Sequence, residues 1–95
     1  MIRNVVVGRL DPAADPTLIE RGLAGVVALE IEGMTAITAG RDAGLREGNW
    51  DYAITADFTD EAGYRAYDLD EEHNRLRREY FGPASAEIVR IQFVI

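Results

Sequence analysis

The stretch WDYAITADF, residues 50–58, alternates apolar and mainly polar side chains more regularly than any other part of this 95-residue chain. Successive side chains of an extended strand point to opposite faces. One face therefore collects the side chains of Trp50, Tyr52, Ile54, Ala56 and Phe58. The pattern predicts a half-buried antiparallel strand, with Trp50 and Phe58 packed in a core on the side that helices cover.

Three other segments favour strands. Residues 2–10 are rich in valine, residues 34–41 read MTAITAGR, and residues 86–95 read AEIVRIQFVI. In the last segment, Arg90 and Gln92 point to one side. The apolar side of that segment holds Val89, Ile91, Phe93 and Ile95.

Helical spacing of apolar residues predicts a helix over about 16–29. Asp15 suits its N-cap, and Pro16 suits its first helical position. Gly22 and Gly25 weaken this helix, and we expect them to allow close packing on the sheet.

A second helical region follows the central strand. Thr59 or Asp60 caps it, and acidic residues occupy its first turn. The pattern is interrupted at the sequence DLD, so a separate helical piece is predicted from Glu71 to Tyr80. The following sequence FGP is expected to end that piece.

The predicted order is β-α-β-β-α-β, which gives an α+β, ferredoxin-like domain spanning residues 1–95. Helices then cover one face of the sheet and leave the other bare. That face would expose Val5, Val7 and further apolar side chains, a large patch for so small a chain. Pairing two such sheets across a two-fold axis buries both patches, so we expect a homodimer.

The composition excludes several classes of function. The net charge is −7 and no basic stripe offsets it, which disfavours nucleic acid and anionic membranes as partners. The chain has no cysteine, so it has neither disulfides nor thiolate chemistry. The start MIRNVVVGRL lacks the apolar run of a signal peptide or membrane span, so a cytoplasmic location is expected.

The segment YDLDEEH, residues 67–73, holds the only histidine. His73 could remove a proton next to a carbonyl group, and Tyr67 could donate a hydrogen bond to the enolate oxygen. Asp70 could orient the imidazole ring, and Arg77 could bind a substrate carboxylate or lower the histidine pKa. The same residues also suit the solvated first turns of a helix, where acids complement the helix dipole.

Other kinds of site receive little support from the sequence. The glycines at 40, 44 and 48 form no recognised nucleotide-binding motif. The possible oxygen and nitrogen ligands show no recognised metal-binding spacing, so no metal is expected; they are Asp57, Asp70, Glu72 and His73. A pocket between the face of Tyr64 and the first strand would be mostly apolar, as ligand sites usually are.

Three segments together resemble the stress-responsive dimeric α/β-barrel (Dabb) domain family: IRNVVVGRL, GNWDYAITADFTD and YDLDEEH. The resemblance covers nearly the whole chain and implies ferredoxin-like protomers whose sheets pair into a barrel. Typical members carry a histidine early in the first strand, where this chain has Asn4. The histidine-proline pair that precedes the last histidine of the family motif is replaced by Asp70 and Glu71.

One branch of the family comprises polyketide cyclases, in which residues matching Tyr67 and His73 act as acid and base in an intramolecular aldol condensation. The resemblance therefore implies a cofactor-free proton-transfer enzyme for a small apolar or aromatic ligand. Alternatives are a non-catalytic ligand-binding or stress protein and a cofactor-independent monooxygenase. The expected ligand contacts are Asn4, Val6, Ile54, Tyr64, Asp70 and Arg77.

Overall fold

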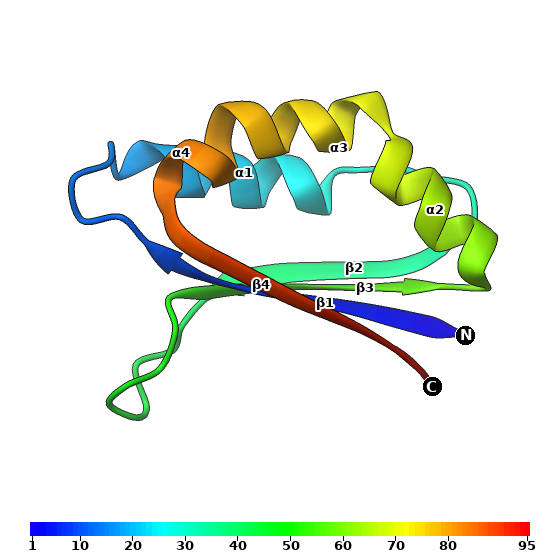
Figure 1. Ribbon diagram of the computed structural model, residues 1–95, viewed down its shortest axis with the longest axis horizontal. Helices are drawn as coiled ribbons and strands as arrows, with labels where there is room; N and C mark the ends of the chain where they lie inside the picture. The colour runs from blue at the N-terminus through cyan, green and yellow to red at the C-terminus, as the bar shows by residue number, and fades with distance from the viewer.

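Four strands form one antiparallel sheet in the order β2-β3-β1-β4 (Figure 1). The computed structural model describes residues 1–95. Its elements are β1 (Ile2–Leu10), α1 (Thr17–Val27), β2 (Met34–Arg41), β3 (Tyr52–Phe58), α2 (Glu61–Leu69), α3 (Glu71–Leu76), η1 (Arg77–Phe81), α4 (Gly82–Ala84) and β4 (Ser85–Val94). The predicted ferredoxin-like α+β fold is confirmed.

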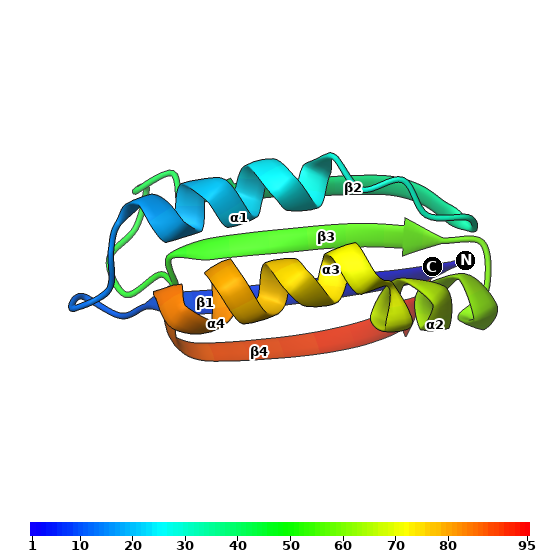
Figure 2. The same ribbon diagram turned by 90° about the horizontal axis from the view of Figure 1, so that it is seen from above.

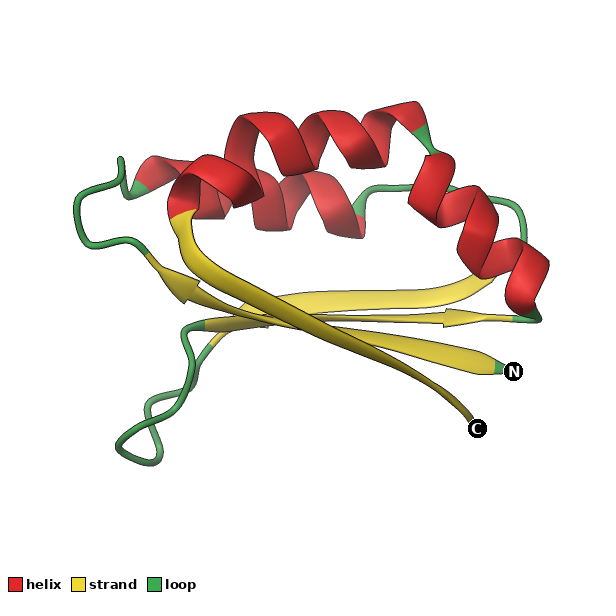
Figure 3. Ribbon diagram, viewed as in Figure 1, coloured by secondary structure: helices red, strands yellow, loops and turns green.

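All helices lie on one face of the sheet (Figures 1 and 3). Seen from above, α1 runs along the β2–β3 side, and α2 to α4 run over the β1–β4 side (Figure 2). The core lies between the two layers, and Phe58, Ile19, Leu76 and Val26 are almost completely buried in it. Each such side chain contributes about 1.5–3 kcal/mol through removal from water.

The predicted strands at 2–10 and 34–41 match β1 and β2, and β4 begins one residue before the predicted 86. The prediction for Trp50 was wrong, because β3 begins at Tyr52. The carboxylate of Asp51 accepts a hydrogen bond from the Leu10 N–H at 2.7 Å and ends the alternation there. Trp50 instead lies outside the core. The guanidinium of Arg9 covers its indole ring, with the guanidinium carbon 4.2 Å from the ring centroid.

Helix α1 begins at Thr17, one residue after the predicted first helical residue Pro16, and ends at Val27, two residues before the predicted end. Pro16 and not Asp15 is its N-cap, although the carboxylate of Asp15 accepts from the Thr17 N–H at 2.9 Å. The expected role of its glycines was wrong. Added Cβ atoms at Gly22 and Gly25 would meet Phe81 of η1 and Leu76 of α3. These glycines therefore allow close packing of α1 against α3 and η1, not against the sheet.

The chain does not leave its helical path at FGP. A wider π-helical turn, η1, precedes α4, and the Gly82 N–H donates to the carbonyl of Arg77. Pro83 lies in the first turn of α4, so the proline does not end the helical path. The helical region therefore ends at Ala84, beyond the predicted Tyr80.

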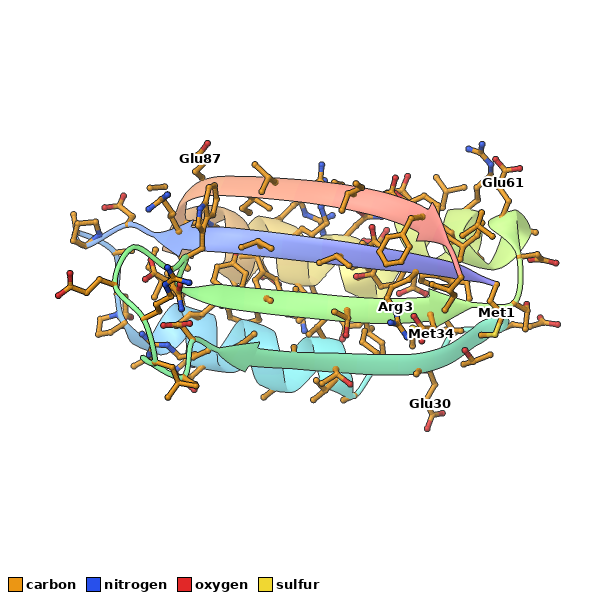
Figure 4. The ribbon with its side chains drawn as sticks, turned by 90° about the horizontal axis from the view of Figure 1, so that it is seen from below. Met1, Arg3, Glu30, Met34, Glu61 and Glu87 are labelled. Carbon is orange, nitrogen blue, oxygen red and sulfur yellow. The ribbon has the colours of Figure 1, made fainter.

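The opposite face of the sheet carries no helix (Figure 4). Three side chains of β4 on this face are among the most exposed large apolar groups: Val89 is 44 % exposed, Ile91 62 % and Phe93 43 %. Their cross-strand neighbours in β1 include Val5 and Val7. We call these five residues the bare face. No helix of the chain is both long and apolar enough to cross a bilayer.

Candidate functional site

A cavity of about 480 Å³ lies between the sheet and the helices. The sheet contributes side chains from β1, β3 and β4, and the helical layer contributes the rest. From the sheet come Asn4, Val6, Tyr52, Ile54, Ile88 and Arg90. From the helices come Val26, Tyr64, Tyr67, Asp68, His73, Asn74, Arg77, Arg78, Phe81 and Gly82.

The break between α2 and α3 brings Tyr67 and His73 together. Asp70 leaves the helical conformation, with ψ at 130°, and its carboxylate accepts from the His73 backbone N–H at 2.9 Å. The Asn74 side chain donates to the carbonyls of Asp68 and Asp70, both at 3.0 Å. The rings of Tyr67 and His73 consequently stack, with centroids 3.8 Å apart and planes 27° apart.

The ring of His73 is oriented by a backbone carbonyl, not by Asp70 as the sequence led us to expect. Nδ1 of His73 lies 2.8 Å from the carbonyl oxygen of Tyr67. A carbonyl can only accept, so Nδ1 carries the proton and the neutral ring keeps its lone pair on Nε2. The carboxylate of Asp70 instead caps the first turn of α3.

Two polar atoms of this pair are open to the cavity. Neither Nε2 of His73 nor the hydroxyl of Tyr67 has a hydrogen-bond partner within the protein, although both residues are buried. Every side-chain nitrogen or oxygen that is sealed from solvent has a hydrogen-bond partner. The two unpaired atoms are therefore not sealed from solvent. Since both side chains line the cavity, the two free atoms are accessible through it.

Burial fixes the protonation states of the pair. It lowers the pKa of His73 below 6.5; Arg77 acts in the same direction, whereas the Tyr67 carbonyl, Asp68 and Asp70 oppose it. Burial likewise raises the pKa of Tyr67 to about 12. Near neutral pH the site therefore combines an uncharged imidazole base with a protonated phenol donor.

Asn4 lies on β1, at the position where the resemblance leads us to expect a histidine. The residue is 2 % exposed, and its Oδ1 accepts from Nε2 of Gln92 at 2.7 Å. This contact directs the amide NH₂ group of Asn4 away from Gln92. Because Asn4 lines the cavity and no sealed side-chain nitrogen is unpaired, that NH₂ group is available as a donor.

Other residues singled out in the sequence also line the cavity, namely Val6, Ile54, Tyr64 and Arg77. Asp70 does not, because it is occupied as a helix cap. Sequence reasoning missed Phe81, Ile88 and Arg90 as lining residues. The alternation of β4 carried the signal for Arg90, since it placed this residue opposite the apolar side of the strand.

The carboxylates considered as metal ligands lie apart. Asp57 is on the bare-face side of the sheet, where Arg3, labelled in Figure 4, contacts both its oxygens at 2.7 and 2.8 Å. Glu72 pairs with Arg75 on the exposed side of α3. No group of three or more metal-ligating side chains is positioned to hold an ion.

Solved structures with the same fold include proteins of unknown function and an enzyme. A dimeric ferredoxin-like protein of unknown function from Thermobifida fusca has a TM-score of 0.87 and 28% identity, with 99% of this chain and 90% of that chain covered. A Dabb family protein from Mesorhizobium loti has a TM-score of 0.76, 24% identity, and coverage of 99% and 95%. A hydroxynitrile lyase from Passiflora edulis has a TM-score of 0.81, 21% identity, and coverage of 99% and 92%.

Sequence comparison gives the family. No functionally curated protein matches the chain. The sequence profile of the stress responsive A/B barrel domain matches residues 2–95. The match covers every strand and helix described above, including the segment from Tyr67 to His73. The chain therefore belongs to the stress-responsive A/B barrel domain (Dabb) family.

Proposed function

We propose that the chain binds a small, partly apolar carbonyl compound in this cavity and moves a proton on it with its own side chains. The observation that carries the proposal is the pairing of two free atoms in one apolar cavity: Nε2 of His73 and the hydroxyl of Tyr67. These two atoms make no hydrogen bond that would stabilise the fold, so both are free to act on a ligand.

The chemistry follows from the protonation states. Nε2 of His73 takes a proton from a carbon next to the ligand's carbonyl group, and the C–H electrons become the enolate. The Tyr67 hydroxyl donates to the enolate oxygen, where negative charge develops. The amide of Asn4 positions the carbonyl from the sheet side. In a polyketide-like ligand the enolate carbon attacks a second carbonyl, and the proton held by His73 returns to the new alkoxide.

The relatives are compatible with an enzymatic role for the cavity. One solved structure of the same fold is a hydroxynitrile lyase, a protein named for a reaction on a small molecule. The competing function is ligand binding without turnover. The apolar side chains of Val6, Ile54 and Ile88 in the cavity support ligand binding and catalysis equally well, because they would hold a ligand whether or not a proton moves.

We also infer that two copies pair through the bare face. Val89, Ile91 and Phe93 expose apolar surface that a monomer would leave in water. The ion pair between Arg3 and Asp57 satisfies both charges on the same side of the sheet, so its burial leaves no charge unpaired. Several solved relatives are dimeric ferredoxin-like proteins.

Deuterium exchange tests the catalytic proposal. The probe is 2-tetralone, a bicyclic ketone, in D₂O buffer, with incorporation next to the carbonyl followed by NMR. The wild-type protein is expected to accelerate exchange over buffer, and His73→Gln to lower that acceleration by about 10²–10⁴-fold. Tyr67→Phe should also lower it. Tyr80→Phe is the matched control, since Tyr80 does not line the cavity.

Three results contradict parts of the proposal in different ways. Tetralone that does not bind, as judged by line broadening, overturns the ligand site for bicyclic ketones. Binding without faster exchange supports the non-catalytic alternative. Fast exchange that survives His73→Gln removes His73 from its role as base.

A further inference from the structure

We propose that the ligand of this cavity carries a carboxylate beside its apolar body, and that Arg90 is the residue that selects for it. This inference rests on the proposed ligand site and adds the class of substrate. The observation behind it is that Arg90 is the only arginine lining the cavity whose guanidinium has no partner in the protein.

The position of Arg90 follows from the register of the sheet. Arg90 lies opposite Val6 in the ladder between β4 and β1, and Val6 lines the cavity. On the same side of β4, Ile88 also lines the cavity and Gln92 binds Asn4. Arg90 therefore stands between two residues that face the helices, although β4 is an edge strand whose other side is free.

The other cavity arginines are already engaged. Arg77 donates to Oδ1 of Asn74 at 3.3 Å and lies 3.9 Å from a carboxylate oxygen of Asp68. Arg78 donates to Glu71 at 3.5 Å. Arg90 is an exposed residue that lines the cavity and takes part in no ion pair and no side-chain hydrogen bond, so its donors are available to a ligand.

The charge of the cavity opposes that of the molecule. The chain carries a net charge of −7. The cavity lining nevertheless contains Arg77, Arg78 and Arg90 against a single carboxylate, Asp68. Both Arg77 and Arg90 act to lower the pKa of Tyr67, which agrees with their lying near its ring. An anionic group between β4 and the helices would lie near the unpaired Arg90 on the sheet and near Arg77 on the helices.

A carboxylate fits better than a phosphate. One planar guanidinium offers two parallel N–H donors, which match the two oxygens of a carboxylate. A phosphate dianion would need further free donors, and Arg77 and Arg78 are paired. With its carboxylate at Arg90 on the sheet, the ligand would span the cavity toward Tyr67 and His73 on the helices.

A structural role for Arg90 is the competing explanation. Charged residues on an edge strand discourage pairing with other chains. That role requires only an exposed charge and predicts no preference between ligands, so a matched pair of ligands separates the two explanations.

The test uses 2-naphthoate and its uncharged analogue 2-naphthamide, with affinities measured by calorimetry at neutral pH. We expect the wild type to bind the acid about tenfold more tightly than the amide. Arg90→Gln should remove about tenfold of affinity for the acid and leave the amide within twofold. Arg46→Gln is the control, because Arg46 is exposed in the loop after β2 and does not line the cavity.

Equal affinities of the wild type for acid and amide would overturn the carboxylate preference while leaving the ligand site intact. Equal loss of both ligands in Arg90→Gln would assign Arg90 a structural role and likewise overturn the proposal. If neither compound binds the wild type, the proposed ligand site and its anion preference both fail.

Discussion

The imidazole of His73 stacks on the phenol of Tyr67 with ring centroids 3.8 Å apart, and its Nδ1 lies 2.8 Å from the carbonyl of the same tyrosine. Tyr67 thus holds the histidine by both its ring and its backbone. This arrangement fixes the tautomer of His73 without any contribution from another side chain. It leaves Nε2 and the phenol hydroxyl as the two free polar atoms of the pair.

Replacing Tyr67 by Phe should separate stability from chemistry. The hydroxyl of Tyr67 has no protein partner, so its removal is expected to change the free energy of unfolding by less than about 0.5 kcal/mol. Tyr52→Phe is the matched control, because the Tyr52 hydroxyl bonds Oγ of Ser85 at 2.7 Å. Its loss should cost about 1 kcal/mol in urea titrations. A larger cost for Tyr67→Phe than for Tyr52→Phe would show that the Tyr67 hydroxyl has a structural partner.

Gly8 is expected to tolerate no side chain. A Cβ there would lie 2.1 Å from the ring of Tyr52, which is buried and tied to Ser85. Gly8→Ala should therefore destabilise the protein by about 1–3 kcal/mol, as measured by urea denaturation. Gly40→Ala, in strand β2, which β3 separates from β1, has nothing within 4 Å of the added carbon and should be close to neutral. Equal effects of the two substitutions would contradict the tight contact at Gly8.

Asp70 has two effects that substitutions can divide. Its carboxylate caps α3 through the His73 N–H, and its charge raises the pKa of His73. Asp70→Ala should cost about 1 kcal/mol and lower that pKa. Asp70→Asn keeps a good cap, so it should lower the pKa of His73 with little loss of stability. Thermal unfolding and NMR titration measure the two effects, and an unchanged pKa in both variants would rule out the electrostatic role.

A charge on the bare face should separate the proposed dimer. Ile91→Glu is expected to give a monomer in analytical ultracentrifugation, because an unpaired carboxylate at 62 % exposed Ile91 would have to be desolvated in the interface. Leu69→Glu is the control, since Leu69 is 79 % exposed on α2, among the helices. A wild-type protein that sediments as a monomer would contradict the pairing, as would an Ile91→Glu dimer.

Much of the fold could be predicted from short-range patterns. Strand-forming residues and period-two alternation located the four strands, and Asp60 was one of the two caps predicted for α2, where its carboxylate accepts from the Gly63 N–H. Trp50 was misplaced because Asp51 uses its side chain to bond Leu10, a contact between distant segments that alternation cannot reveal. The extension through Pro83 depends on the π-helical turn, which has no clear sequence signature.

Only part of the candidate site could be predicted from the sequence. The spacing of Tyr67 and His73 and the interruption at DLD indicated that both could face one cleft. The carbonyl that orients His73 could not be inferred, since backbone acceptors leave no trace in residue identity. The sequence placed Arg90 on the correct face of its strand. It could not show that Arg77 and Arg78 pair with acidic residues while Arg90 has no partner.

The pKa of His73 links the site to stability. Its folded-state pKa is lowered by burial, so the neutral imidazole contributes stability that is fully present above about pH 6.5, the unfolded value. That contribution is lost as the pH falls through the lower folded-state pKa. The free energy of unfolding should therefore fall less steeply with decreasing pH below about 6.5 in His73→Gln than in the wild type.

The most direct test of the account is NMR of the His73 imidazole, whose signals need no assignment because the chain has one histidine. The account predicts a pKa below 6.5 and, above it, a neutral ring with the proton on Nδ1 and the lone pair on Nε2. Nitrogen-15 shifts of the two ring atoms report the tautomer. A pKa at or above 6.5, or a proton on Nε2, would contradict the assignment of His73 as a base facing the cavity.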